Sequence, residues 1–259
     1  MEKLERNYLL RAAMPWLVMV VFFLLWELAC VAFAIPEIIL PRPSKVFEVI
    51  ILRFDILLKF CLQTLWSTVI GFVLAIAGGL LLGLAIGASP FVYSGLYPLL
   101  IAFNAIPKVA IVPILMIWVG VGFLPAIITA FVISFFPIVV NVATGLATIE
   151  PEMRDVMRSL GASRTEILIK VGIPRAMPYL FASLKVAITL AFIGSVIAET
   201  VGGNNGIGFL MLSAGARNDA PTTFAGLFAI AVMGILMYAI CAWFERRMTK
   251  WAFRGELVT

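Results

Sequence analysis

Six long stretches of apolar residues alternate with shorter polar segments along the chain. We place the stretches at residues 16–34, 64–88, 92–118, 123–148, 178–200 and 222–243. A helix rises 1.5 Å per residue, so about 20 apolar residues cross the ~30 Å hydrocarbon core of a bilayer. Helices are favoured because backbone groups in lipid must find partners within their own segment, and the sequence lacks the alternation of a membrane β-barrel. The pattern predicts an all-α, polytopic membrane protein with six transmembrane helices.

The composition agrees with this class and narrows the possible chemistry. Of the 259 residues, 63% are hydrophobic and 13% are charged, and the mean hydropathy is +1.11. A soluble domain of this size needs far more polar surface. The chain contains no histidine, which removes His-based catalytic triads and most zinc sites. The cysteines lie far apart in or beside apolar segments and are expected to be small packing residues, at Cys30, Cys61 and Cys241.

The net charge of +5 is interpreted as a topology signal, and no nucleic-acid partner is expected. Lys and Arg collect on the cytoplasmic side of membrane helices. With the N-terminus inside, the cytoplasmic segments 1–15, 149–177 and 244–259 carry three, five and four Lys or Arg residues, whereas the opposite side carries five. The sequence therefore predicts that both termini are cytoplasmic.

The first apolar stretch has an alternative interpretation as a cleavable signal peptide. Basic residues precede it, and Ala32-Phe33-Ala34 lies at its end. However, the apolar run is longer than the core of a typical signal peptide, and Glu27 interrupts it. We expect the stretch to remain as the first transmembrane helix.

Residues 35–62 form a polar segment on the predicted outer side. Ser44 can cap a helix after Pro43. At 100° per residue, a helix over about 44–60 has a narrow polar stripe of Lys45, Glu48, Asp55 and Lys59. The pattern predicts an amphipathic helix lying on the outer membrane surface. Arg53 falls off the stripe and has no explanation in this pattern.

The second apolar stretch carries a small residue at every fourth position, at Gly71, Ala75, Gly79, Gly83 and Gly87. Such a stripe lets another helix approach closely. We expect tight helix packing along it, and a sliding surface used in gating is the alternative.

The polar segment between the fourth and fifth spans is predicted to form two short helices. Pro151 suits a first helical turn, and carboxylates near it favour the positive end of the helix dipole, at Glu150, Glu152 and Asp155. Gly161 supplies a stop, because glycine tolerates a left-handed conformation. Ser163 and Glu166 match an S-x-x-E capping box for the second helix, which Pro174 is expected to end. These start, stop and capping signals indicate a folded element and argue against a passive linker.

This segment resembles the cytoplasmic coupling loop of ATP-binding-cassette importer permeases, the EAA loop. The consensus of that loop is an acidic residue, two alanines, a glycine four residues later, and an apolar-x-Leu-Pro ending. Here Asp155-Val156-Met157 occupies the acid-Ala-Ala position, Gly161 follows, and Val171-Gly172-Ile173-Pro174 matches the ending. Valine and methionine replace the alanines, and isoleucine replaces the leucine, so the fit to a partner's groove is expected to differ in detail.

Other segments are similar to permeases that import nitrate, sulfonates and bicarbonate. Leu40-Pro41-Arg42-Pro43 with Val46 resembles the element after their first span. Residues 106–113, followed by Trp118-Val119-Gly120, resemble their third-span signature. Residues 159–163 and 206–209 also fit, so that the resemblance covers the chain from about residue 16 to 250.

The resemblance implies a type I ABC-importer permease-like fold in a bacterial inner membrane. Residues 1–62 would hold the first transmembrane helix and the outer helix, and residues 63–250 the permease core, with 149–177 as its coupling loop. It further implies a homodimer, two cytoplasmic ATPase subunits and a separate periplasmic or lipid-anchored solute-binding protein. The residues expected to couple to the ATPase are Glu152, Asp155, Val156, Met157, Arg158, Ser159, Gly161, Ala162 and Pro174. The alternative is that this segment is only a charged cytoplasmic surface in contact with solvent.

No G-x-x-x-x-G-K-[ST] phosphate-binding loop occurs in the sequence. ATP is therefore expected on the partner subunit. We expect this chain to bind no cofactor or metal and to have no catalytic residues of its own.

Polar groups inside the apolar stretches are candidates for the translocation pathway, because they are costly in lipid. Lys108 lies between Pro107 and Pro113, where broken helix geometry exposes backbone groups to a cavity. A cation facing the pathway suits an anionic solute; pairing with Glu27 or Glu199 as a structural contact is the alternative. The pathway candidates are Asn104, Lys108, Ser134, Ser195 and Glu199.

Milder polar residues have ordinary interpretations. Lys185 lies about two turns from the cytoplasmic end of the fifth span, close enough to extend to the interface. Hydroxyl side chains in membrane helices, such as Thr189 and the serines above, most often bond a backbone carbonyl. The loop at 202–206 is expected to be an outer-facing turn.

Two other classes of membrane protein are alternatives to an importer permease. A stand-alone secondary transporter or channel would show an inverted repeat and carboxylates at mid-membrane, and it would leave the capped loop without a role. A membrane enzyme would need convergent acid–base groups or metal ligands. The favoured function is therefore the transmembrane permease subunit of an importer for a small, anionic solute resembling sulfonate, nitrate or bicarbonate.

Overall fold

The computed structural model describes residues 2–148 and 150–249, which form helices and short connections with no strand among them. The chain divides into unit 1, residues 1–58 and 210–229, and unit 2, residues 59–209 and 230–259. The α-helices are α1 (Glu2–Ala32), α2 (Pro43–Leu52), α3 (Phe54–Gly87), α4 (Pro90–Ala105), α5 (Val112–Val119), α6 (Phe123–Ala147), α7 (Pro151–Ser159), α8 (Arg164–Ile167), α9 (Ile173–Gly202), α10 (Gly206–Ala216) and α11 (Ala220–Met248). A 3₁₀ turn, η1, covers Lys108–Ile111, and a π-helical turn, η2, covers Leu168–Gly172.

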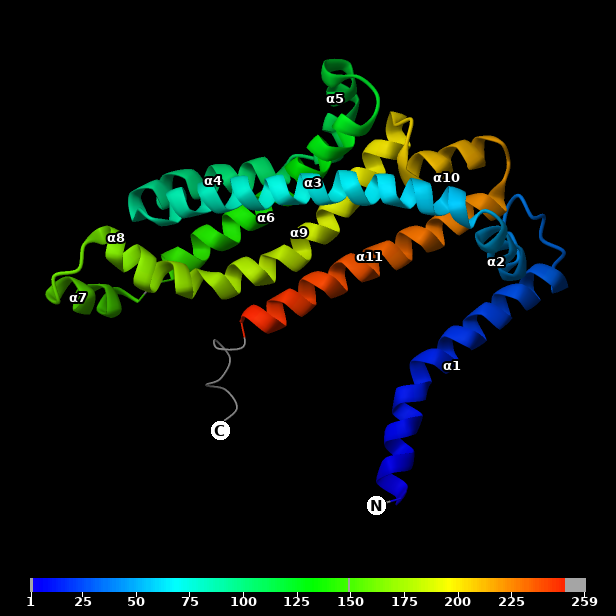
Figure 1. Ribbon diagram of the computed structural model, residues 1–259, viewed down its shortest axis with the longest axis horizontal. Coiled ribbons are helices and arrows are strands. Elements are labelled where there is room, and N and C mark those ends of the chain that lie inside the picture. Colours follow the sequence, from blue (N-terminus) through cyan, green and yellow to red (C-terminus); the bar gives the residue numbers. More distant parts are fainter. Residues whose placement is uncertain (1, 149, 250–259) are drawn as a thin grey trace. The chain divides into compact units, whose positions relative to one another are not determined.

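The predicted six-span, all-α fold is confirmed if a bent helix pair is counted as one span. Five described segments are long and apolar enough to cross a bilayer: Met14–Ala32, Phe54–Gly87, Phe123–Ala147, Thr165–Ala216 and Ala220–Met248. The sixth is the pair Phe91–Ala105 and Lys108–Val119, whose axes differ by 75° (Figure 1).

The third span, predicted at 92–118, is broken near Pro107, as its prolines led us to expect. The helix stops at Ala105, and Ile106 adopts an extended conformation with φ −67° and ψ 131°. Pro107 explains the break, because a proline disfavours the helical conformation of the residue before it. The third span therefore consists of two helical pieces with non-helical backbone between them.

Unit 2 is built around α6 and α9, which pack together along most of their lengths. α3 and α4 run beside α6 (Figure 1). The core between these helices is apolar, and its fully buried members include Ala75, Ile138, Val142, Ala187 and Ala191.

The small-residue stripe of α3 brings its backbone against α6. A Cβ atom at Gly79 would lie 2.8 Å from Cβ of Ile138, and one at Gly83 would lie 2.7 Å from Cβ of Val142. Real Cβ atoms do not approach each other so closely, so glycine is required at both positions. The tight packing predicted from the stripe is confirmed.

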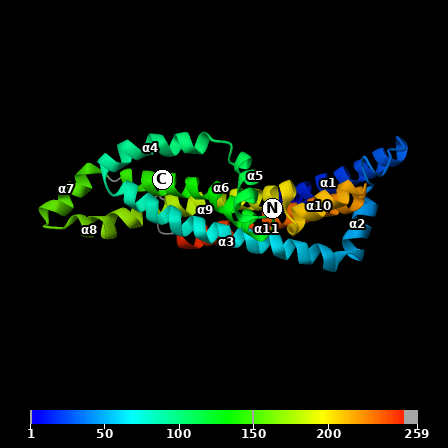
Figure 2. The same cartoon turned by 90° about the horizontal axis from the view of Figure 1, so that it is seen from above.

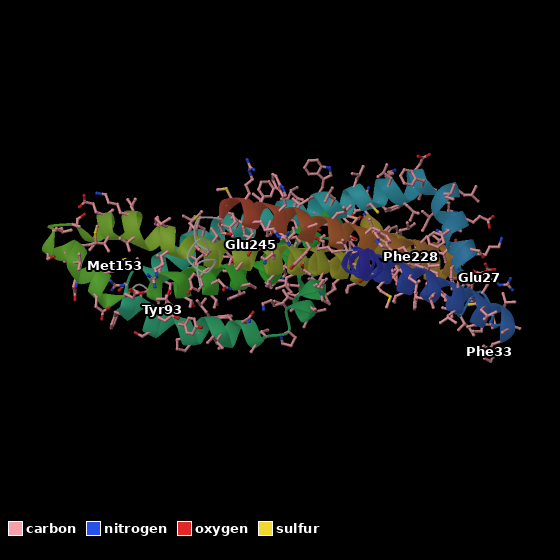
Figure 3. The ribbon with its side chains drawn as sticks, turned by 90° about the horizontal axis from the view of Figure 1, so that it is seen from below. Glu27, Phe33, Tyr93, Met153, Phe228 and Glu245 are labelled. Carbon is pink, nitrogen blue, oxygen red and sulfur yellow. The ribbon has the colours of Figure 1, made fainter. Side chains whose placement is uncertain are left out.

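Unit 1 joins α1 to α2 through a carboxylate and a group of aromatic rings. Glu27 accepts hydrogen bonds from the backbone N–H of Ser44 at 3.0 Å and from its hydroxyl at 2.9 Å. Ser44 is therefore not the predicted helix cap; that position belongs to Arg42. Ring centroids lie 5.6–6.1 Å apart along a cluster of Phe23, Trp26, Phe47, Phe224 and Phe228, the last of which is labelled in Figure 3.

The predicted outer helix over 44–60 is wrong in length. α2 ends at Leu52, and Arg53 has φ −113° and ψ 26°, which turns the chain before α3 begins. Asp55 and Lys59 consequently belong to α3 and do not continue the polar stripe of α2. The alternation of charges is compatible with one helix or two, and the turn at Arg53 decides between them.

Arg53 lies outside the polar stripe predicted for the outer helix, and its side chain finds partners in a distant part of the chain. Its Nη1 atom donates to Oδ2 of Asp219 at 2.8 Å and to the hydroxyl of Thr222 at 2.7 Å. Burial of Asp219 disfavours its ionised form, but hydrogen bonds from Thr222 and Arg53 outweigh this, so the pKa of Asp219 lies below its ordinary value.

Replacing Gly83 by leucine should destabilise the protein by about 1–3 kcal/mol, because the added atoms force α3 away from Val142. Gly95→Ala is the matched control, since a Cβ at Gly95 meets nothing within 4 Å. Thermal unfolding in detergent should show a lower Tm for Gly83→Leu and an unchanged or slightly raised Tm for Gly95→Ala. Equal Tm values for the two variants would contradict the close contact.

Candidate functional site

The helix α7 begins and ends as its local sequence predicts. Glu152 lies in its first turn and Arg158 in its last, as the helix dipole favours. It ends in a Schellman motif, in which the N–H of Ala162 donates to the carbonyl of Met157 at 3.0 Å and that of Gly161 to Arg158 at 2.9 Å. Gly161 has φ +80°, in the left-handed region. The predicted glycine stop is confirmed.

Ser163 and Glu166 form the predicted capping box at the start of α8. The N–H of Glu166 donates to Oγ of Ser163 at 3.2 Å, and the N–H of Ser163 donates to Oε2 of Glu166 at 2.9 Å. Two N–H groups that lack helical partners are thereby satisfied.

The prediction that Pro174 ends the second helix is wrong. α8 continues through the π turn directly into α9, and Pro174 lies in the first turn of α9. Proline has no N–H to donate. The wider π turn, in which the N–H of Ile173 donates to the carbonyl of Leu168, carries the chain past this position. The helical path from residue 164 to residue 202 is therefore continuous.

An ion pair closes the base of the loop that contains α7 and α8. Nη2 of Arg175, on α9, donates to Oε1 of Glu150, which precedes α7, at 2.8 Å. Figure 2 shows α7 and α8 at one end of unit 2, beyond the ends of α6 and α9. The ion pair therefore holds the start of the loop to α9, and the end of the loop continues into the same helix.

The surface of α7 is exposed and mixes charged with apolar side chains. Val156 is 58% exposed and Leu160 76% exposed, and Met153 lies on the same helix (Figure 3). Of the residues predicted to couple to an ATPase, Met157 and Ala162 are half-buried, and Pro174 lies on α9. The exposed members on the loop are Glu152, Asp155, Val156, Arg158, Ser159 and Gly161.

The break in the third span brings together two of the predicted pathway residues. Nζ of Lys108 donates to the main-chain oxygen of Asn104 at 3.1 Å and to its Oδ1 at 2.7 Å. The same ammonium lies 5.2 Å from the ring centroid of Phe136 on α6. Pairing of Lys108 with Glu27 or Glu199 is not among the ion pairs between described residues.

Glu199 is 2% exposed and helps to hold the start of α10. The first N–H groups of a helix lack partners within it. Here the N–H groups of residues 206–208 find side-chain acceptors, in order Gln63 Oε1 at 3.1 Å, Thr64 Oγ1 at 2.8 Å and Glu199 Oε2 at 3.1 Å. Thr64 also donates to Glu199 at 2.8 Å. We name this group the α10 cap.

The sequence reasoning missed both α10 and its cap. A signal was present in the second span, where three hydroxyl residues share one face of an apolar helix, at Thr64, Ser67 and Thr68; the structure buries all three. Buried polar groups need partners. Their clustering therefore indicated a polar contact with another element.

The remaining polar candidates have local partners or none. The hydroxyls of Ser134 and Thr189 each donate to the carbonyl four residues earlier in their helix, as expected. Oγ of Ser195 is buried and has no hydrogen-bond partner in the part of the chain that the structure describes. Lys185, expected to extend to the interface, pairs with Glu245 near the end of α11 at 2.7 Å.

Replacing Glu199 by leucine should lower stability by about 1–3 kcal/mol, because the N–H of residue 208 loses its acceptor in a buried site. Glu199→Gln keeps an acceptor oxygen and should cost less. Thr189→Val serves as a control, since Thr189 is exposed and bonds within its own helix. Thermal unfolding in detergent, with amide exchange at residue 208, measures the effect. Unchanged exchange in Glu199→Leu would contradict the cap.

Comparisons with known proteins identify a family and several relatives of this chain. The family model described as "Binding-protein-dependent transport system inner membrane component" matches residues 75–250. The chain is 28% identical over 249 residues to the formylaminopyrimidine transport permease of Halalkalibacterium halodurans, covering 96% of this chain and 98% of that one. It is 28% identical over 240 residues to the taurine transport system permease of Escherichia coli, covering 90% and 86%.

A solved structure shares the fold. A chain of the inward-facing MetNI methionine ABC transporter matches with a TM-score of 0.58 at 22% identity, covering 74% of this chain and 93% of that one. The region matched by the family model includes the capped loop, the broken third span and the α10 cap residue Glu199. The chain therefore belongs to the family of inner membrane components of binding-protein-dependent transport systems.

Proposed function

We propose that two copies of this chain form the translocation pathway of an ATP-binding-cassette importer for a small anionic solute. Two cytoplasmic ATPase subunits would bind the loop of α7 and α8, and a solute-binding protein would deliver the solute on the opposite side. The observation that carries this proposal is the loop itself, which is capped, closed at its base and exposed on its outer surface. A folded and exposed loop of this kind can bind another protein and transmit its displacement to α9.

The path of the force follows from the helix connections. ATP binding would draw the ATPase subunits together and move α7 with the groove that holds it. The helical path from residue 164 to 202 is continuous, so a displacement of the loop reaches the whole of α9. Because α9 packs on α6 along most of its length, both spans would tilt together. In this proposal Asp155, Arg158 and Gly161 make the central contacts.

The cytoplasmic location of the loop is supported by the distribution of basic residues. Segments 1–15, 149–177 and 244–259 carry most of the Lys and Arg residues. We therefore place both termini and α7 on the cytoplasmic side. Hydrolysis of ATP is assigned to the partner subunit, because the sequence has no phosphate-binding loop of its own.

A second copy of the chain is supported by the surface left uncovered at the break in the third span. Residues 106 and 107, where the helix of an apolar span is interrupted, are exposed. Non-helical backbone at membrane depth is tolerated where it is buried in protein or lines a water-filled cavity, and not against lipid. A dimer with a passage between its two copies meets this requirement.

An anionic solute is supported by one relative and by one side chain. The relative from Escherichia coli is named for taurine, which carries a sulfonate group. Lys108 offers a cation at the break in the third span. The named solutes of the relatives differ, so we assign the choice of solute mainly to the binding protein.

Replacing Gly161 by valine should abolish co-purification of the ATPase subunits while leaving membrane insertion intact. A side chain at Gly161 meets nothing within 4 Å, so the cost arises from the left-handed φ of +80°. Gly161→Asn is the control, because asparagine tolerates this conformation and should retain the ATPase. Retention in both variants would defeat the assignment of α7 as the coupling element.

Reversing one charge of the Glu150–Arg175 pair should weaken binding of the ATPase subunit by up to about fivefold, the equivalent of an exposed ion pair of about 1 kcal/mol. The double variant Glu150→Arg/Arg175→Glu should restore most of the affinity. Lys45→Gln, which breaks the exposed Lys45–Glu48 pair, is the control and should have no effect. Binding of labelled ATPase subunits to the chain in nanodiscs gives the Kd. Failure of the double variant to recover would show that the two residues act separately.

A further inference from the structure

The ammonium group of Lys108 is only partly satisfied by its own chain. A lysine ammonium has three N–H donors. Two are directed at the main-chain oxygen and the Oδ1 atom of Asn104, and the ring of Phe136 lies 5.2 Å from the nitrogen. These partners hold the group in position and carry no full negative charge. None of the ion pairs between described residues involves Lys108.

Three carboxylates in the apolar helices, at Glu27, Glu199 and Glu245, are already engaged elsewhere. Glu199 accepts hydrogen bonds from Thr64 and from the N–H of residue 208. Glu245 pairs with Lys185, and Glu27 accepts both hydrogen bonds of Ser44. A second copy of the chain brings the same three carboxylates with the same partners. The counter-ion of Lys108 is therefore expected to come from outside these groups.

The depth of Lys108 makes an uncompensated charge costly. α4 has 16 residues and is therefore about 24 Å long, shorter than the ~30 Å hydrocarbon core, so a helix of this length that starts at one face of the core ends inside it. Ionisable groups at such depth face a water-filled cavity or a charged partner. Discontinuous helices at membrane depth supply binding sites in other transporters.

We propose that Lys108, held by Asn104 beside the ring of Phe136, binds the anionic group of the transported solute as the solute passes the break between α4 and α5. The ligand class is a small sulfonate or carboxylate, which accepts the remaining N–H donor and neutralises the charge. Asn104 is a positioning residue, because it orients the ammonium. This inference rests on the proposed function, in which the chain forms an aqueous translocation pathway.

Cysteine reactivity tests the proposal without knowledge of the natural solute. The chain is purified with its ATPase subunits and reconstituted in lipid nanodiscs, with Cys30, Cys61 and Cys241 replaced by alanine. Asn104→Cys places a thiol near Lys108 and keeps the main-chain oxygen of residue 104, which accepts from Lys108 at 3.1 Å in the native chain. The thiol is treated with the anionic reagent 2-sulfonatoethyl methanethiosulfonate and, separately, with its cationic trimethylammonium counterpart. The ratio of the two rates reports the local electrostatic potential.

We expect both reagents to reach the thiol and the anionic one to be favoured. Adding Lys108→Gln should lower the anionic-to-cationic rate ratio by about tenfold, as expected for loss of a unit charge a few ångströms away. Lys185→Gln is the matched control: Lys185 is a second lysine in an apolar helix, but it is paired with Glu245, and its removal should leave the ratio unchanged.

Two results would overturn the proposal. If neither reagent reacts, residue 104 faces lipid chains or a protein partner and does not line an aqueous pathway. If the ratio is unchanged by Lys108→Gln, the lysine does not select anions. Co-purification of the ATPase subunits is scored on the same preparation, so failure of the proposed function appears as a missing subunit and not as an altered ratio.

Discussion

Polar groups that interrupt apolar helices must find partners inside the protein, and the organisation of this chain depends on that constraint. Two interruptions meet it in opposite ways. At the start of α10, three N–H groups need acceptors, and the side chains of Gln63, Thr64 and Glu199 provide them. At the end of α4 a carbonyl needs a donor, and the ammonium of Lys108 provides it. The first solution is closed and buried, whereas the second leaves a charge incompletely paired.

That difference separates a structural role from a functional one. The α10 cap is buried and uses neighbouring helices of one chain, so it fixes the end of α9 against α3. The site at Lys108 combines the exposed Asn104 with the half-buried Lys108 and Phe136, and it includes a cation without an acidic partner among the described residues. Lys108 and Glu199 were both candidates for the pathway, and their surroundings give them different tasks.

Close packing makes the proposed mechanism possible. Glycines of α3 bring its backbone against α6, and α6 packs along α9. Packed interiors transmit displacement because they have little free volume. The loop of α7 and α8 adds an exposed surface to this body, and the Glu150–Arg175 pair with the continuous helix into α9 gives that surface two connections to it.

By itself the sequence determined the features that arise from neighbouring residues. The apolar lengths specify the membrane class, Gly161 specifies the end of α7, and Ser163 with Glu166 specifies the start of α8, because each depends on interactions within a few positions. The glycine spacing of α3 likewise indicated close packing. Only the tertiary structure decided the partners of Arg53, Lys108 and Glu199, the existence of the α10 cap, and the passage of the helix through Pro174. These outcomes depend on which distant groups meet and on whether a local geometry such as a π turn is available. Helical periodicity along one segment carries no information about either.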